Sequence, residues 1–475
     1  MSVKKNFLYN LSYQLLLMIL PFITTPYISR VIGAEGVGIQ AYTISIANYF
    51  VLFAMLGINN HGNRSIAMVR GDKDEMSKSF WSIYLIQFIM ATFMIILYCI
   101  YFFRIAKEYK LVFSIQVLYL IGALLDINWF FFGMEKFKLT VVRNTIVKLV
   151  SVLSIFIFVK KSSDIYIYSF ILAAGSLISQ IILWNYLFKY IKLTYISFND
   201  IKKHFKPIIV LFLPVIAISI YKIMDKIMLG MFSDVVQVGF YENSEKIINI
   251  PLGIIAALGT VMLPKISNLI SMGCEEESKK YIRNSMKFAM FTSIGSMFGL
   301  IGISDTFIPI FLGEEFNSCS KVVSLLAVTI IFIAWANVLR TQFLIPKKKD
   351  KVYIISTFLG AVVNVSINLL LIAQYGAIGA TIGTIFAEGT VAIYQTLMIR
   401  KEIELSRYLK ESIFFIIPGS IMCFVLIFIG EKMGSSILTG IVQIIVGGLI
   451  YVSISLVYFI FNKYQESNFF HLKNK

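Results

Sequence analysis

The sequence is poor in charge and in the residues that usually carry catalytic chemistry. Charged residues make up 15% of its 475 positions, against roughly a quarter in soluble proteins. It has four cysteines and three histidines, which are far apart in the sequence. No C-x-x-C, H-E-x-x-H, G-x-S-x-G or P-loop motif occurs, so nothing indicates a disulfide framework, a metal centre or ATP hydrolysis by the chain itself. We therefore expect a protein that is not an enzyme and needs no cofactor.

Long hydrophobic runs take the place of charge, because 58% of the residues are hydrophobic. A helix needs roughly 20 apolar residues to cross a bilayer. Runs of this length predict fourteen membrane spans, at 10–30, 37–58, 80–103, 111–132, 140–159, 165–188, 207–231, 247–270, 288–312, 322–345, 352–373, 377–399, 412–430 and 437–461. Backbone groups in lipid must be satisfied within each segment, so we expect an all-α, polytopic membrane protein.

The net charge of +17 is distributed unevenly between the two sides of the predicted membrane. If the N-terminus lies inside and each cation near the end of a span is counted with the adjoining side, the inner side carries 31 of the 43 Lys and Arg residues and the outer side carries 9. The remaining three lie deeper within spans. This bias follows the positive-inside rule and predicts that both termini are cytoplasmic. The basicity is thus explained by topology, and we expect no nucleic-acid partner.

An internal repeat divides the chain into two related halves. Val37-Gly38 and Val238-Gly239 are 201 residues apart, and at the same shift Arg64 corresponds to Lys265. We therefore predict an N-terminal lobe of six spans at 1–190, a cytoplasmic linker at 191–206 and a second six-span lobe at 207–400. Two further spans and a tail follow at 401–475. Parallel repeats of this kind favour a substrate cavity between the lobes.

Three charges interrupt the seventh predicted span, in the stretch SIYKIMDKIMLG. Lys222, Asp225 and Lys226 share one helical face, and a charge at the bilayer centre costs about 2.5–3.5 kcal/mol on insertion scales. In one interpretation, Lys222 and Asp225 form a pair that fixes packing. In the other, this face lines the cavity, and its two cations bind an anionic group such as a diphosphate.

Other charges in or near the spans are candidates for the same cavity. The candidate cations, each of which could instead be topogenic or snorkelling, are Lys148, Arg30, Arg64, Lys265 and Arg340. The acids that could couple transport to an ion gradient are Asp126, Asp225 and Glu388. Lys148 could instead form an ion pair with Asp126 that has only a structural role.

Five stretches resemble the polysaccharide transporter family, the Wzx-like oligosaccharide flippases of the multidrug/oligosaccharidyl-lipid/polysaccharide superfamily. They are the opening NLSYQLLLMILPFITTPYISRVIGAEGVGIQAYTISIANYF, WFFFGMEKFK at 129–138, VGFYENSEKIINIPLG at 238–253, TQFLIPKKKDK at 341–351 and YGAIGATIG at 375–383. The resemblance covers nearly the whole chain. It implies two lobes, fourteen helices in the longer members, and alternating access.

The resemblance also implies a function: moving undecaprenyl-diphosphate-linked oligosaccharides from the inner to the outer leaflet of a bacterial cytoplasmic membrane, for O-antigen, capsule or exopolysaccharide assembly. Its implied partners are the lipid-linked substrate, the bilayer, and a polysaccharide polymerase with its chain-length machinery, and transport would be coupled to an H⁺ or Na⁺ gradient or to the membrane potential. Related lipid II flippases carry arginines deep in the first span, where this chain has Gln14. The alternatives are a lipid II flippase, a multidrug or organic-cation antiporter of the same superfamily, a membrane scaffold and an intramembrane glycosyltransferase subunit.

Overall fold

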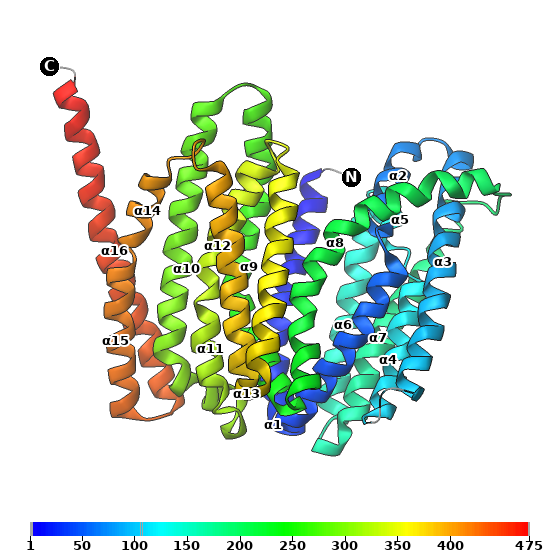
Figure 1. The fold of residues 1–475 in the computed structure, drawn as a ribbon, viewed down its shortest axis with the longest axis horizontal. Coiled ribbons are helices and arrows are strands. Elements are labelled where there is room, and N and C mark those ends of the chain that lie inside the picture. The colour runs from blue at the N-terminus through cyan, green and yellow to red at the C-terminus, as the bar shows by residue number, and fades with distance from the viewer. Residues whose placement is uncertain (1–2, 105, 107, 474–475) are drawn as a thin grey trace. The chain divides into compact units, whose positions relative to one another are not determined.

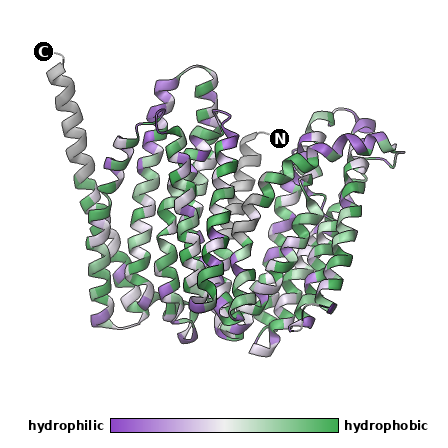
Figure 2. Cartoon of the chain, viewed as in Figure 1, coloured by the Kyte–Doolittle hydropathy of each residue, from purple (hydrophilic) through white to green (hydrophobic). Residues whose placement is uncertain are grey.

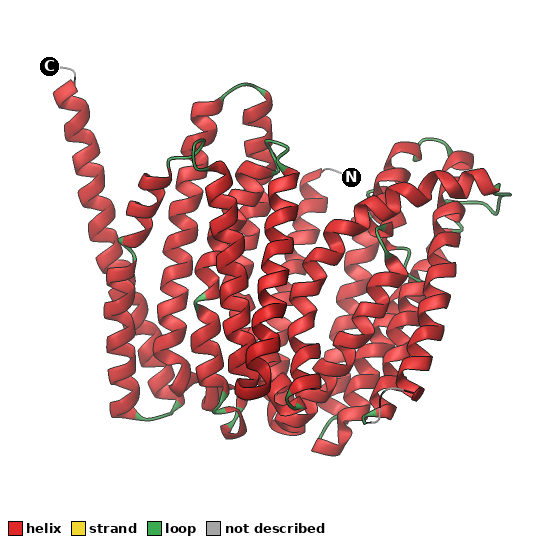
Figure 3. Ribbon diagram, viewed as in Figure 1, coloured by secondary structure: helices red, strands yellow, loops and turns green. Residues whose placement is uncertain are grey.

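A computed structural model describes residues 3–104, 106 and 108–473, and helices connected by short loops account for most of them (Figure 3). No strand occurs in this described part of the chain. The prediction of an all-α fold is therefore confirmed.

The chain forms two compact units, Met1–Glu242 and Asn243–Lys475, and the boundary falls inside one helix, α9. The helices of the first unit are α1 (Val3–Met55), α2 (Ile58–Val69), α3 (Lys73–Arg104), α4 (Lys110–Leu124), α5 (Asn128–Gly133), α6 (Phe137–Phe158), η1 (Ser162–Asp164), α7 (Ile165–Leu187) and α8 (Phe198–Phe232) (Figure 1). Those from α9 onward are α9 (Val235–Ser271), α10 (Glu275–Leu312), η2 (Glu314–Phe316), α11 (Cys319–Ala327), α12 (Thr329–Leu339), η3 (Arg340–Leu344), α13 (Asp350–Ile399), α14 (Leu405–Ile413), α15 (Ile416–Met433) and α16 (Ile437–Lys473).

Eleven stretches among the described residues are long and apolar enough to cross a membrane. Two of them contain a glycine outside helical geometry, Gly33 with φ 71° in α1 and Gly376 with φ 52° in α13. Such left-handed positions favour glycine because it has no Cβ. Each break falls between two of the predicted spans, and α8 is a further long helix over the predicted span at 207–231. The eleven stretches are therefore compatible with the fourteen predicted spans.

Large apolar side chains point away from the bundle along whole helices. On α3 the exposed residues Ile89, Phe93, Ile96, Ile100 and Phe103 recur every three or four positions and form one stripe. A water-soluble protein rarely exposes a contiguous apolar surface of this length. The helices in Figure 2 are also coloured as hydrophobic over much of their length. The chain is therefore a multi-pass membrane protein.

Aromatic side chains form the core of the first unit. Phe80 of α3 stacks on Trp129 of α5 with ring centroids 5.3 Å apart, and both are fully buried. Gln87 accepts a hydrogen bond from Trp129 Nε1 at 3.0 Å. The WFFFG stretch at 129–133 thus packs a short helix against α3, which positions the break between α4 and α6.

Helix α8 packs against α1, α2 and α3 and belongs to the first compact unit. The repeat predicts instead that residues 207–231 open the second lobe, and the lobe boundaries at 190, 206 and 400 stay a prediction. In the second unit, α15 and α16 pack on α10, where Tyr451 donates a hydrogen bond to the carbonyl of Phe291 at 2.7 Å.

Candidate functional site

Two polar pairs connect the end of α8 to the start of α9. The helices are joined at Ser233 and Asp234, and the Asp234 carboxylate accepts a hydrogen bond from the backbone N–H of Gln237 at 2.8 Å in the first turn of α9. Residues at equal distances before and after this turn therefore face one another. The charges that interrupt the seventh predicted span lie on this hairpin.

Asp225 and Lys226 each bind a side chain 16 residues further along. The hydroxyl of Tyr241 donates a hydrogen bond of 2.6 Å to the Asp225 carboxylate, and both side chains are buried. The Lys226 ammonium lies 2.5 Å from the Glu242 carboxylate, with side chains 16% and 19% exposed. A buried carboxylate requires such a donor, because burying a charge without hydrogen bonds is costly.

These contacts identify partners that the sequence reasoning missed. Tyr241 and Glu242 belong to the VGFYENSEKI stretch, and they meet Asp225 and Lys226 only because the chain reverses between α8 and α9. The side chain of Lys222 lies outside the described residues, although its backbone belongs to α8. Whether Lys222 or Lys226 binds substrate therefore stays a prediction.

Asp126 lies in a buried network at the break between α4 and α5. Its carboxylate accepts hydrogen bonds from the backbone and the side-chain amide of Asn128, at 2.8 and 2.7 Å. The Asn128 amide oxygen accepts in turn from the guanidinium of Arg143 at 2.9 Å. This network connects a carboxylate to a buried arginine through one neutral amide. Lys148, the partner considered for Asp126, is exposed on α6.

The other cations predicted in the first unit are exposed. Arg64 lies on the outer surface of α2, and Arg30 of α1 is exposed with a long 3.5 Å contact to the carbonyl of Pro26. Their cavity role stays a prediction.

The two predicted cations of the second unit each lie over a tyrosine ring. The Lys265 ammonium is 3.7 Å from the ring centroid of Tyr281, and the Arg340 guanidinium is 5.6 Å from that of Tyr353. Arg340 also begins the π-helical turn η3, a feature that is frequent at functional sites. The face of an aromatic ring attracts a cation even when the cation is exposed to solvent.

Glu388, the third candidate acid, is buried in α13.

Two histidines that are 143 residues apart in the sequence lie side by side. His61 Nε2 of α2 and His204 Nδ1 of α8 are 2.8 Å apart, and both rings are buried. The pKa of His204 is lowered to about 4, mainly by burial and in smaller part by the charges of His61 and Lys203, whereas the charge of Asp200 opposes the shift. The neutral form of His204 is thus favoured. Sequence distance gave no indication of this pair.

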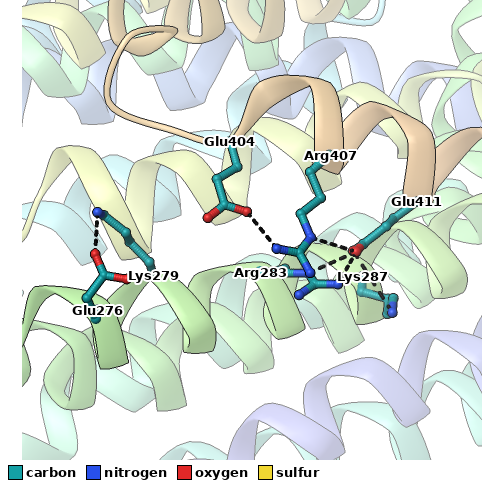
Figure 4. Close-up of polar contacts among 7 residues, drawn as sticks. All are labelled: Glu276, Lys279, Arg283, Lys287, Glu404, Arg407 and Glu411. Carbon is teal, nitrogen blue, oxygen red and sulfur yellow. Dashed lines mark hydrogen bonds and ion pairs between the residues drawn. The ribbon is translucent and has the colours of Figure 1, made fainter. Parts of the chain in front are cut away.

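A cluster of ionic side chains connects α10 to α14 (Figure 4). The buried carboxylate of Glu411 binds the Arg283 guanidinium, and Arg407 Nε and Lys287 Nζ lie 3.5 and 4.0 Å from its oxygens. Arg283 and Lys287, which the charge count treats as topogenic, thus also hold α10 against α14, whereas Arg407 pairs with Glu411 within α14. Among residues 3–104, 106 and 108–473, no three His, Cys, Asp or Glu side chains lie close enough together to hold a metal ion.

Known proteins resemble the chain over most of its length. A protein of Shigella dysenteriae named as an O-antigen transporter is 28% identical over 384 residues, which cover 80% of this chain and 96% of that protein. A second, from Escherichia coli strain K12 and named likewise, is 23% identical over 84% of this chain and 97% of its own length. The solved lipid II flippase MurJ, in an inward closed conformation, superposes with a TM-score of 0.76 at 19% identity, covering 95% of this chain and 99% of that one.

The structural likeness to MurJ concerns the fold alone, since the sequence identity is low. A sequence-family match goes further, because the family described as polysaccharide biosynthesis protein matches residues 3–270, more than half of the chain. The resemblance inferred from the five sequence stretches is thereby confirmed. With its polytopic helical fold and this match, the chain belongs to the polysaccharide biosynthesis protein family.

Proposed function

We propose that this protein is a flippase that moves lipid-linked oligosaccharide units across the cytoplasmic membrane. The observation that carries the proposal is the similarity to the Shigella dysenteriae O-antigen transporter, which extends over 96% of that protein. The multi-pass helical fold supports it, because a flippase must enclose a polar head group within the bilayer. We infer that the chain acts by transport and not by catalysis.

The substrate class follows from the chemistry of such units. An undecaprenyl-diphosphate-linked oligosaccharide has a polyprenyl tail that can stay in lipid and a polar head group that cannot cross bare hydrocarbon, since unpaired polar groups cost several kcal/mol there. Alternating access of two lobes would carry the diphosphate and the sugars from the inner to the outer leaflet. The charge bias supports a cytoplasmic location for both ends of the chain.

The pair formed by Lys226 and Glu242 suggests how a diphosphate could be held. In the structure the lysine is neutralised by a carboxylate at 2.5 Å. A diphosphate is a stronger anion and can replace Glu242 as the partner of Lys226, with Lys222 on the same helical face as the second cation. Release would restore the pair with Glu242. The diphosphate of the substrate and the Glu242 carboxylate would thus alternate as the partner of Lys226, so that the lysine always faces an anion.

Coupling to an ion gradient requires a carboxylate that can change its partner. Asp126 and Glu388 are the candidates for H⁺ or Na⁺, and a polymerase with its chain-length machinery is the proposed partner for the exported unit. Asp126 is hydrogen-bonded to Asn128, so a role in coupling would require the network with Arg143 to open. The membrane potential is the alternative driving force.

Deletion of the gene tests the proposed function. We expect loss of one surface polysaccharide and accumulation of its lipid-linked unit on the inner leaflet, both restored by the wild-type gene. Intact surface glycan with altered tolerance to cationic drugs would support the antiporter alternative. Arrest of cell-wall synthesis with intact surface glycan would support lipid II as the substrate.

A further inference from the structure

Residues 188–206, which comprise the loop between α7 and α8 and the first turns of α8, expose large apolar side chains outside the helical bundle. Leu193, Tyr195 and Phe198 are 79%, 87% and 76% exposed, and Phe188 and Phe205 are exposed as well. We call residues 188–206 the aromatic–lysine segment. Apolar side chains this exposed in water are unfavourable, so the segment is expected to be covered.

Lysines alternate with these apolar residues. Lys189, Lys192, Lys202, Lys203 and Lys206 are all exposed, and the segment contains one acid, Asp200. Its carboxylate caps the start of α8 by accepting from Ser197 and lies 3.5 Å from Lys203. The segment therefore combines a strong positive charge with exposed aromatic rings.

The backbone of the segment is anchored, so its side chains are held in place. The N–H of Lys192 donates to the hydroxyl of Ser77 at 3.0 Å, and its carbonyl accepts from Trp81 Nε1 at 2.9 Å. The neighbouring Ile191 is buried. The exposure of Leu193 and Tyr195 thus results from a defined loop conformation in which they point away from the core.

Covalent connections place the segment at the surface of the bilayer. It follows directly on α7 and continues into α8, two helices whose apolar parts lie over predicted spans. The first turns of α8 lie across the ends of α2 and α3, and hydrophilic residues gather along them (Figures 1 and 2). With both ends tied to membrane helices, the segment cannot move far from the lipid head groups.

We propose that the aromatic–lysine segment is a membrane-surface anchor whose rings insert among the head groups while its lysines bind anionic phospholipids. Segments that lie in the membrane interface typically combine aromatic and basic residues. At the level of the head groups, the apolar part of each ring is removed from water. The lysines complement the negative charge of the inner leaflet. A cytoplasmic protein partner would cover the rings too, but it would not explain why the segment is tethered to the bilayer at both ends.

Hydrogen–deuterium exchange of the full-length protein in lipid nanodiscs tests the anchor. Two lipid compositions are compared, phosphatidylcholine alone and an equimolar mixture with phosphatidylglycerol. We expect the loop amides of residues 193–196 to exchange about tenfold more slowly in the anionic discs, since several lysines lie within a Debye length of the surface. High salt should remove the difference. Equal exchange in the two compositions would overturn the proposal.

The loop between α9 and α10 supplies an internal control. It also exposes a large apolar residue, Met272, but three glutamates follow at Glu275, Glu276 and Glu277. Anionic lipids should repel this loop, so exchange at residues 272–274 should not slow. Slower exchange in both loops would indicate a general effect of the anionic discs and would overturn the specific claim.

Two variants separate the apolar from the electrostatic contribution. Tyr195→Ser with Phe198→Ser should raise loop exchange severalfold in both kinds of disc. Lys189→Gln, Lys202→Gln and Lys206→Gln together should remove the difference between discs and leave the apolar contribution in place. If a variant fails to fold, the comparison of lipids on the wild-type chain still decides. Protection that appears only when a cytosolic extract is added would favour a protein partner and overturn the anchor.

Discussion

Gly38 of α1 and Gly239 of α9 lie backbone against backbone. A methyl group on Gly38 would fall 1.6 Å from the carbonyl oxygen of Val235 and 3.1 Å from the nitrogen of Gly239. One on Gly239 would fall 2.2 Å from the carbonyl oxygen of Ala34 and 3.2 Å from the nitrogen of Gly38. These are the glycines that the 201-residue repeat places in equivalent positions. The contact explains why both copies of the repeat carry glycine at this point.

Substitution of either glycine should destabilise the protein. In Gly38→Ala the new methyl group meets backbone atoms that cannot rotate away, so we expect a loss of at least about 3 kcal/mol, the upper range for an overpacked core. Melting of the purified protein in detergent measures it. Gly122→Ala in α4 is the matched control, because its nearest neighbour would be 3.9 Å away. Equal melting temperatures for the two variants would show that the glycine contact is not tight.

The pair of Lys226 and Glu242 can be tested by exchange of charge. Lys226→Ala removes the ammonium that lies beside the partly buried Glu242 carboxylate, which should cost up to about 3 kcal/mol. Lys226→Glu with Glu242→Lys should recover most of that stability, since the pair is re-formed in reverse. Melting of the single and double variants measures the coupling. If the reversed pair is no more stable than Lys226→Ala, the contact contributes little to folding.

The role of Lys222 is decided by a double variant. If Lys222 binds the diphosphate, Lys222→Arg should keep partial transport and Lys222→Ala should insert normally but lose it. If Lys222 serves only to balance Asp225, then Lys222→Ala should lower expression and Lys222→Ala with Asp225→Ala should restore both protein level and transport. Transport of the lipid-linked unit is compared at equal protein level. Full activity in the double variant would end the ligand hypothesis.

Acidification should loosen the contact between α2 and α8. The pKa of His204 is lowered from the usual value near 6.5 to about 4 in the folded protein. Between these values the unfolded chain binds more protons, so stability is complete above about pH 6.5 and falls as the pH approaches about 4, by roughly 3 kcal/mol at most. Melting temperature against pH measures this, and His204→Asn should flatten the dependence in that window. An unchanged pH profile in His204→Asn would assign the effect to other groups.

Topology is tested by reporters that are active only outside the cytoplasm. The charge bias predicts that fusions at both termini are inactive. An insertion between Lys161 and Ser162, in the loop that connects α6 to η1, should be active and serves as the positive control. Activity at either terminus would show that the number of spans is wrong.

The sequence predicted the family and the helices, but it did not predict the side-chain contacts of the α8–α9 hairpin. The WFFFG stretch, for example, lies in one of the five stretches that identify the family. The five stretches were enough to identify the family, and the apolar runs predicted the helices, including the division of α1 near Gly33 and of α13 near Gly376. The charged stretch at 219–230 was also recognised as unusual. Its partners were not, because Tyr241 and Glu242 become neighbours of Asp225 and Lys226 only when the chain reverses at Ser233.

Hydropathy and charge placement alone determine that this chain crosses the membrane many times. Long apolar runs are stable in lipid, and in lipid the backbone can satisfy its hydrogen bonds only by forming helices. The tertiary structure decided which polar groups meet. His61 and His204 pair directly, as do Glu411 and Arg283, while Asp126 and Arg143 are connected through Asn128; no periodicity in the sequence predicts these contacts. Each buried charge must find its partner across a helix–helix contact, and such contacts are set by the packing of whole helices and not by the pattern within any one of them.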